Sequence, residues 1–194
     1  MFNLLLMKHF KRIVFLLFFN ISYLPAQIVK EWSVIHYPLN NPQNYSVTDR
    51  DQMRFLSNGD IITGWRFNFS GGNSAIGTTS YNQNGNLNWE RFYSGAFLDD
   101  GTILTVEIDS VDNIYTLGVV NDQTAYADNA IIKYDSNGNQ LWVTDDDSLE
   151  SGGQSSLLIE DRYYVQSRFS PSLYQFDLNG IILDSLNIDS FSLG

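Results

Sequence analysis

The sequence predicts an all-β protein built from repeated four-stranded units. Tyr and Phe, which favour strands, number 11 and 13 among 194 residues, and long stretches of helix-forming residues are missing. Four Asn-Gly dipeptides lie between runs of β-branched and aromatic residues, as in tight hairpin turns. Two of them belong to near copies of one segment, "YNQNGNLNW" at 81–89 and "YDSNGNQLW" at 134–142.

The N-terminal segment has the features of a secretory signal peptide. The basic segment "KHFKR" at 8–12 precedes the apolar run "IVFLLFF", and Ala26 supplies a small residue for cleavage. The apolar stretch is shorter than the roughly 20 residues of a membrane span, so no stable membrane insertion is expected after cleavage. We expect residues 1–26 to be removed, residues 27–45 to form an N-terminal strand and linker, and the protein to be secreted or held at the cell surface.

Residues 46–194 divide into three units with two hairpins each, at about 46–95, 96–148 and 149–194. The second hairpin turns, at Gly85, Gly138 and Gly180, are 53 and 42 residues apart. Four strands in a repeat of 40 to 50 residues are typical of β-propeller blades. The expected strands are 53–56, 60–67, 75–82 and 87–94 in the first unit, 104–109, 114–120, 130–135 and 140–144 in the second, and 155–159, 162–169, 172–177 and 181–188 in the third.

Residue patterns also predict which strands are covered. The segment "IYTLGVV" (114–120) is apolar on both faces, as in a sheet packed on both sides. In "NLNWERFY" (86–93) the residues alternate, which places Leu87 and Trp89 on one face and Asn88 and Glu90 on the other. We expect this strand to be the outer strand of its blade.

Three blades are too few to close a ring, because propellers have at least about four. The sequence therefore predicts an incomplete or open propeller. It leaves three alternatives: a fragment of a longer chain, an association of copies, or an open stack of sheets.

Residues 109–143 resemble the SBBP-type β-propeller repeat of exported bacterial proteins. The matching elements are Asn-Ile-Tyr…Gly at 113–118, Tyr-Asp…Gly-Asn at 134–139 and Leu-Trp at 141–142. Residues 58–90 are a looser copy, and the third unit has Asp184 where the Trp stands in the others. The resemblance implies an exported propeller module.

The Gly-x-x-x-Trp spacing from Gly85 to Trp89 and from Gly138 to Trp142 is similar to the tryptophan-docking motif of quinoprotein propellers. In that family the indole packs between neighbouring blades, which implies the same structural role for Trp89 and Trp142. Quinoprotein catalysis needs a closed eight-bladed ring and a calcium site, so we expect no cofactor here.

Charge and cysteine content exclude several classes of function. The formal net charge is −11 and becomes −14 without residues 1–26, so nucleic acid is not an expected partner. The chain has no cysteine, which excludes disulfides, thiol nucleophiles, thiolate metal sites and the acylation of a bacterial lipoprotein.

No catalytic constellation stands out. His36 is the single histidine after residue 26, and Gly-x-Ser-x-Gly is absent, so a Ser-His-Asp site is not predicted. Paired carboxylates suffice for glycoside cleavage, but no pair is singled out, and the segment "DSNGNQLW" departs from the sialidase Asp-box at its defining positions.

Two kinds of loop are the candidate sites. Asp145, Asp146, Asp147 and Glu150 are candidate metal ligands in "TDDDSLESGG", although their spacing is not that of a calcium loop and the pattern favours a solvated acidic loop. The loops at 68–74 and 121–129 join the middle strands of two blades and so emerge on the same side. Their candidate binding residues are Asn73, Asp122, Tyr126 and Asp128.

The sequence thus predicts an exported, non-catalytic propeller module that binds or scaffolds a protein or glycan at the cell surface. A glycan-active hydrolase or lyase is the competing class, and a degenerate fragment of a larger secreted protein is the third alternative.

Overall fold

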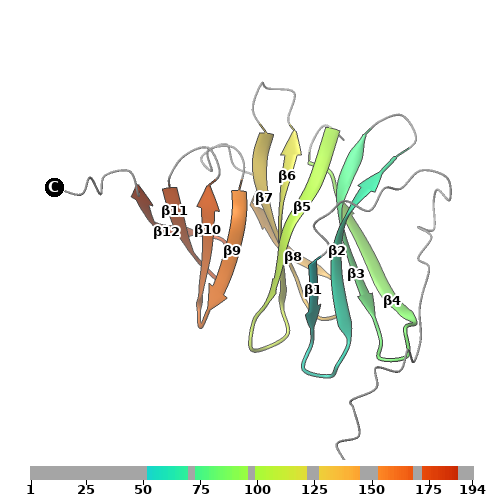
Figure 1. The fold of residues 1–194 in the computed structure, drawn as a ribbon. Coiled ribbons are helices and arrows are strands. Elements are labelled where there is room, and N and C mark those ends of the chain that lie inside the picture. The colour runs from blue at the N-terminus through green and yellow to red at the C-terminus, as the bar shows by residue number, and fades with distance from the viewer. Residues whose placement is uncertain are drawn as a thin grey trace, which may run out of the picture. The chain divides into compact units, whose positions relative to one another are not determined.

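The computed structural model describes residues 52–69, 73–95, 99–121, 127–144, 153–167 and 172–187. These residues form three four-stranded antiparallel sheets and no helix (Figure 1). The prediction of an all-β chain with three four-stranded antiparallel blades is therefore confirmed, and the sheets are not closed into a barrel. The arrangement is open and propeller-like. None of the described segments is a helix long and apolar enough to cross a membrane.

Each sheet is a meander in which neighbouring strands follow one another in sequence (Figure 1). Sheet A contains β1 (Gln52–Phe55), β2 (Ile61–Asn68), β3 (Ser74–Tyr81) and β4 (Leu87–Tyr93). Sheet B contains β5 (Asp99–Ile108), β6 (Ile114–Asn121), β7 (Ala127–Tyr134) and β8 (Gln140–Thr144). Sheet C contains β9 (Gly153–Ile159), β10 (Arg162–Ser167), β11 (Ser172–Asp177) and β12 (Ile182–Asn187).

In four of the tight turns between strands the glycine has a positive φ, whereas the Asn before it does not. The values of φ are 83° at Gly59 and Gly180, 79° at Gly85 and 77° at Gly138. An acidic or amide side chain at the start of three of these turns accepts hydrogen bonds from the turn backbone. The Oδ1 of Asp135, for example, accepts bonds from the backbone N–H groups of Asn137 and Asn139.

The last hairpin of every sheet has a register shift at the same place, next to Tyr81, Tyr134 and Phe176. In sheet A this shift makes Leu87 the partner of Tyr81, whereas Trp89 is the partner of Ser80. Adjacent residues of a strand point to opposite faces, so Leu87 and Trp89 lie on opposite faces. The simple alternation expected for this strand was wrong for that reason, since one extra residue is inserted between them.

Three strands begin two or more residues earlier than the sequence pattern predicted. β5 begins at Asp99 instead of residue 104. Its first residues were not predicted because two register shifts against β6 interrupt the alternation of the strand. β9 begins at Gly153 instead of residue 155. β7 begins at Ala127 instead of residue 130, and its pairing with β6 extends to Asn121, so the loop expected at 121–129 is shorter.

Two apolar layers hold the sheets together. The first lies between sheets A and B and includes Ile62, Ile76, Val106, Ile114 and Ile132, each at most 1% exposed. The second lies between sheets B and C, and its fully buried members are Tyr115, Leu117, Ile131, Tyr163, Val165 and Phe176. Sheet B is therefore covered on both faces, as its doubly apolar strands predicted.

Candidate functional site

The same tryptophan hydrogen bond occurs at both junctions between sheets. Trp89 on β4 donates an Nε1 hydrogen bond of 3.0 Å to the carbonyl oxygen of Ser136, in the last turn of sheet B. Trp142 on β8 donates a bond of 3.1 Å to the carbonyl oxygen of Leu178, in the last turn of sheet C. Each indole thus links the outer strand of one sheet to the last turn of the next.

The turn that receives each indole needs glycine. A Cβ atom on Gly138 would lie 2.5 Å from the Trp89 ring, and one on Gly180 would lie 3.1 Å from the Trp142 ring. Arg91 strengthens the first junction, because its Nε donates a 2.7 Å hydrogen bond to the carbonyl oxygen of Gly138. Gly85, the corresponding residue of sheet A, has φ of 79°.

Polar contacts also join sheets A and B near their first strands. Arg54 on β1 forms an ion pair of 3.1 Å with Glu107 on β5. The hydroxyl and backbone N–H of Ser57 both donate hydrogen bonds to the carboxylate of Asp112, which joins the first turns of sheets A and B. These contacts set the position of one sheet on the next and involve no reactive group.

A buried charged network lies between sheets B and C. The carboxylate of Asp109, 7% exposed, accepts hydrogen bonds from two backbone N–H groups, from Asn113 Nδ2 and from the Tyr115 hydroxyl. Burial, and then the nearby Asp109 charge, raises the pKa of Tyr115 far above its usual value. Burial lowers the pKa of Lys133, whose ammonium donates to the carbonyl oxygen of Leu178. Each of these three side chains has a hydrogen-bonding partner within the network or in the adjoining turns.

The outer face of sheet C breaks the pattern. Asp184 pairs with Gln175 in the register that Trp89 has with Ser80 and that Trp142 has with Lys133. The outer face of sheet C is therefore equivalent to the faces on which sheets A and B carry their indoles. It carries a carboxylate there instead.

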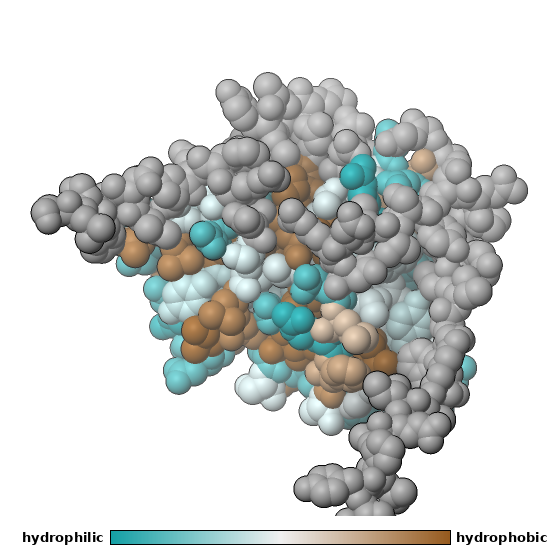
Figure 2. Space-filling view, viewed as in Figure 1, coloured by the Kyte–Doolittle hydropathy of each residue, from teal (hydrophilic) through white to brown (hydrophobic). Residues whose placement is uncertain are grey.

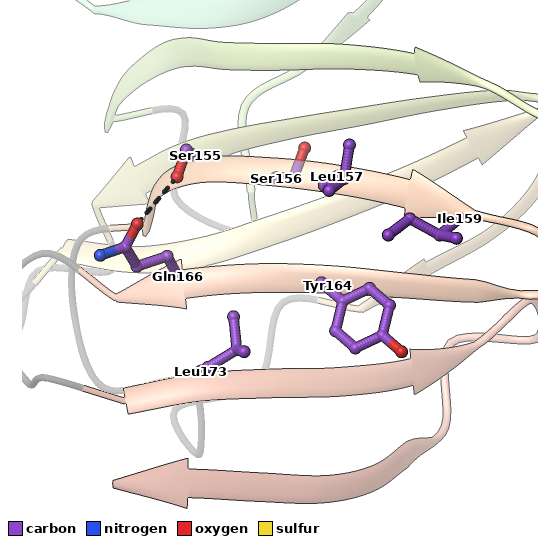
Figure 3. Close-up of a pocket in the computed structure, with 7 residues that line it drawn as sticks. All are labelled: Ser155, Ser156, Leu157, Ile159, Tyr164, Gln166 and Leu173. Carbon is purple, nitrogen blue, oxygen red and sulfur yellow. Dashed lines mark hydrogen bonds between the residues drawn. The ribbon is translucent and has the colours of Figure 1, made fainter. Parts of the chain in front are cut away.

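This outer face contains a shallow groove of about 400 Å³. Figure 3 shows Leu157 and Ile159 on β9, Tyr164 on β10 and Leu173 on β11 along it, with a Ser155–Gln166 hydrogen bond at one end. Leu157 and Ile159 are 53% and 50% exposed. Apolar side chains gather over this part of the molecule, where β9 and β10 lie (Figure 2).

The predicted loop residues are mostly beyond what the structure describes. Asp122 and Tyr126 lie outside the described residues, as do the metal candidates Asp145, Asp146, Asp147 and Glu150. Asp128 lies on β7, where it pairs with Val120. Asn73 immediately precedes β3, and its carbonyl oxygen accepts a 2.7 Å hydrogen bond from the backbone N–H of Phe69. His36 and the predicted signal peptide also lie outside the described part.

The groove was not predicted from the sequence, although one signal pointed to it. The replacement of the repeated Trp by Asp184 marks sheet C as the one whose outer face does not continue the indole series. Within the described ranges, no group of three or more His, Cys, Asp or Glu side chains is placed to hold a metal ion.

Comparisons with known proteins bear on the fold alone. No protein-family model and no curated protein matches the chain. Among the solved structures, the chain is similar to a protein of unknown function from Bacteroides caccae, with a TM-score of 0.52 and 13% identity. The similarity covers 76% of this chain and 48% of the other, so the chain spans about half the length of that protein.

Proposed function

We propose that this chain is an exported, non-catalytic propeller-like module, of the kind that the SBBP-type repeat resemblance implies. It acts by binding or scaffolding a protein or glycan at the cell surface. The observation that carries the proposal is the outer face of sheet C, an exposed apolar groove on a sheet face that is register-equivalent to two sheet-binding faces.

The side chains of the described sites support contact rather than chemistry. The groove contains aliphatic, hydroxyl and amide groups and one phenol, Tyr164. The buried ionisable groups Asp109 and Lys133 are both engaged in holding sheet B to its own turn and to sheet C. A nucleophile with an adjacent base, or a facing pair of carboxylates, is the arrangement that hydrolysis requires.

Export is the part of the proposal that comes from the N-terminal sequence. The basic segment, the apolar run and Ala26 support cleavage after residue 26. Cell fractionation with N-terminal sequencing of the released protein tests this part, with an N-terminus near Gln27 expected. Retention of the protein in the cytoplasm would contradict it.

Binding is tested with the purified full chain and intact cells of its host. We expect saturable retention of labelled protein on the cell surface and no release of reducing sugars from surface polysaccharides. Leu157→Ser, in the groove on β9, should lower retention. Val111→Ser is the matched control, since Val111 is an aliphatic side chain, 72% exposed, in the turn before β6 and outside the groove.

Two outcomes would overturn the proposed function. Release of sugar fragments in proportion to protein concentration would identify a glycan-active enzyme. Absence of retention, together with a missing cooperative thermal transition, would identify a degenerate fragment.

A further inference from the structure

Sheet A packs on sheet B through one of its two faces. Ile62 and Ile76 point to that face and belong to the apolar layer between the two sheets. The main contacts of sheet A with other described strands are with β5 and β6 of sheet B. Trp65 and Phe67 point the other way, because successive residues of a strand alternate between the faces. Together with Ala75, the partner of Phe67, they define the second face of sheet A.

The second face is buried at one end and exposed at the other. Trp65, Phe67 and Ala75 are 9%, 2% and 0% exposed and form an apolar cluster of their own. Met53 and Phe55 on β1 pair with residues of the same face of β2, and they are 54% and 62% exposed. The cover therefore lies over the end of the sheet where β2 finishes and β3 begins.

The sheet supplies part of this cover itself. The ring of Phe92 lies 5.7 Å from that of Trp65 and 4.7 Å from that of Phe67, and Phe69 also contacts Phe67. Phe92 is 36% exposed, so its ring stands at the margin of the cluster. Besides these ring contacts and a hydrogen bond to Thr79, Trp65 has a further contact. Atoms from outside the sheet are therefore needed to complete the cover.

The course of the backbone brings the residues before β1 to this end. Gln52, the first residue of β1, pairs with Gly64, and the two strands are antiparallel. β2 continues beyond this pair to Trp65 and Phe67. The residues that precede Gln52 therefore arrive beside the buried end of the second face. The equivalent strand of sheet B is longer in the same direction, with 10 residues in β5 against 4 in β1.

Residues 34–45 have the composition that such a cover needs. The segment "VIHYPLNNPQNY" contains no Asp, Glu, Lys or Arg. Ile35, Tyr37 and Leu39 stand at every second position, which places them on one side of an extended chain. Residues 46–51 can span roughly 20 Å, which is more than the roughly 13 Å along β2 from Gly64 to its end. The segment therefore has both the length and the apolar side chains to reach the cluster.

Two other stretches near this end fit less well. The loop at 70–72 is Ser-Gly-Gly and has no apolar side chain to bury. Residues 96–98 connect β4 to β5, which packs on the opposite face of sheet A.

We propose that residues 34–45 pack on the second face of sheet A, over Trp65, Phe67 and Ala75. The segment is tethered to β1, which favours a contact within the chain over one with a separate partner. Its apolar side chains shield the aromatic cluster that sheet B does not cover. The protein's own N-terminal segment thus closes this face, while the groove on sheet C stays open to a partner. The inference goes beyond the proposed function and does not depend on it.

Oxidative footprinting of the purified full chain, measured by mass spectrometry, tests the proposal. The comparison is a variant in which a Gly-Ser linker of equal length replaces residues 34–45. We expect oxidation of Trp65 to rise about threefold or more in this variant, because the local opening exposes its ring. Trp89 and Trp142 lie at the two junctions between sheets, so their oxidation should stay unchanged and serves as an internal control.

Two double variants test whether the apolar side chains of the segment make the contact. Ile35→Asp with Leu39→Asp places two charges on the apolar side of the segment, so oxidation of Trp65 should rise as it does with the linker. Asn40→Asp with Asn44→Asp is the matched control, since it adds the same charge at the same spacing and replaces residues that are already polar. This control should leave Trp65 protected.

A spin label gives a second readout in which the apolar side chains of the segment are kept. The chain has no cysteine, so Asn40→Cys provides one attachment site. We expect the label to broaden the NMR signal of the Trp65 indole N–H. The corresponding signal of Trp142, which lies between sheets B and C, should stay sharp.

Equal oxidation of Trp65 in the full chain and the linker variant would overturn the proposal, because another part of the chain would then cover the face. A sharp Trp65 signal in the labelled protein would overturn it as well. If oxidation rises at all three indoles, the variant has unfolded, and the spin label decides. None of these measurements involves export, surface retention or sugar release, so the proposed function is tested separately.

Discussion

Gly138 occupies a position from which any side chain is excluded for two separate reasons. Its φ of 77° lies in the left-handed region, where an L-residue costs roughly 1–2 kcal/mol. Its Cβ would also lie 2.5 Å from the Trp89 ring, and overpacking of this kind costs about 1–3 kcal/mol.

We therefore predict that Gly138→Ala destabilises the protein by the sum of these effects, about 2–5 kcal/mol. Urea unfolding followed by tryptophan fluorescence measures the change. Gly138→Ala in a Trp89→Ala background is the control, because it keeps the backbone strain and removes the clash. An equal loss in both backgrounds would show that the indole contact has no part in the effect.

Trp89 combines a packing contact with one hydrogen bond, and two substitutions separate them. Trp89 is 8% exposed and its ring lies 6.0 Å from that of Tyr134. Trp89→Phe keeps most of the apolar area and loses the bond to Ser136, at a cost of about 1 kcal/mol. Trp89→Ala also leaves a cavity and should cost about 3–5 kcal/mol.

The Arg54–Glu107 ion pair should contribute less to stability than Trp89 does. Arg54 is 39% exposed at its side chain, and an exposed pair contributes about 0.2–1 kcal/mol and less at high salt. Arg54→Ala should therefore change the unfolding midpoint less than Trp89→Ala in the same urea titration. The reverse order would mean that electrostatics, and not indole packing, holds sheets A and B together.

Among the elements, the central strands of sheet B are buried along nearly all of their described length, as β3 of sheet A is. Ile114, Tyr115 and Leu117 on β6 and Ile131 and Ile132 on β7 are all fully buried, with side chains on both faces of the sheet. By contrast, all six residues of β12 are exposed. Backbone hydrogen bonds open most slowly where surrounding packing must open with them.

Hydrogen exchange should therefore rank the strands by cover. We predict the slowest amide exchange in β3, β6 and β7 and the fastest among the described strands in β12, measured by mass spectrometry of peptic fragments. Leu117→Ala should accelerate exchange in sheets B and C together. Equal protection of β12 and β6 would indicate that the outer strand is covered in solution.

Element positions were predicted from the sequence where a turn residue fixed them. Asn-Gly pairs at Gly85 and Gly138 located the last hairpins of two sheets, and the strands after them begin at Leu87 and Gln140, as expected. The early start of β5 at Asp99 was missed because register shifts break the alternation on which strand recognition depends.

The groove could not be predicted from the alternation of residues in the sequence. The segment from Ser155 to Ile159 reads as a short apolar strand, but nothing local says which of its faces meets sheet B. Only the pairing of Tyr163 with Leu158, which sets Leu157 on the opposite face, makes that assignment. The candidate loop residues Asp122 and Tyr126 stay predictions.

For the whole molecule, buried tyrosines predict how stability depends on alkaline pH. Burial, followed by the charge of Glu90, raises the pKa of Tyr81 to about 12, and burial raises that of Tyr134 to about 12, against an ordinary value of 10.0. The folded state holds these protons more tightly than the unfolded state. The stability from the neutral phenols is thus complete below pH 10 and is lost as pH rises from 10 through about 12.

Denaturant midpoints measured across that pH range, with tyrosinate absorbance, check this expectation. Tyr134→Phe removes one of the two groups, so its stability should fall less steeply above pH 10 than that of the native protein. A midpoint that stays constant up to pH 12 would contradict the prediction.

Asp184, at the position of the indole in sheet C, has a consequence for how such a chain is able to rearrange. Duplication or shuffling of sheets A and B brings a matching indole and turn to each new boundary, because each of these sheets contains both its own indole and its own last turn. A gene in which sheet C was moved to an internal position would have one boundary without that fit. Rearrangement is therefore tolerated at one end of this array and penalised at the other.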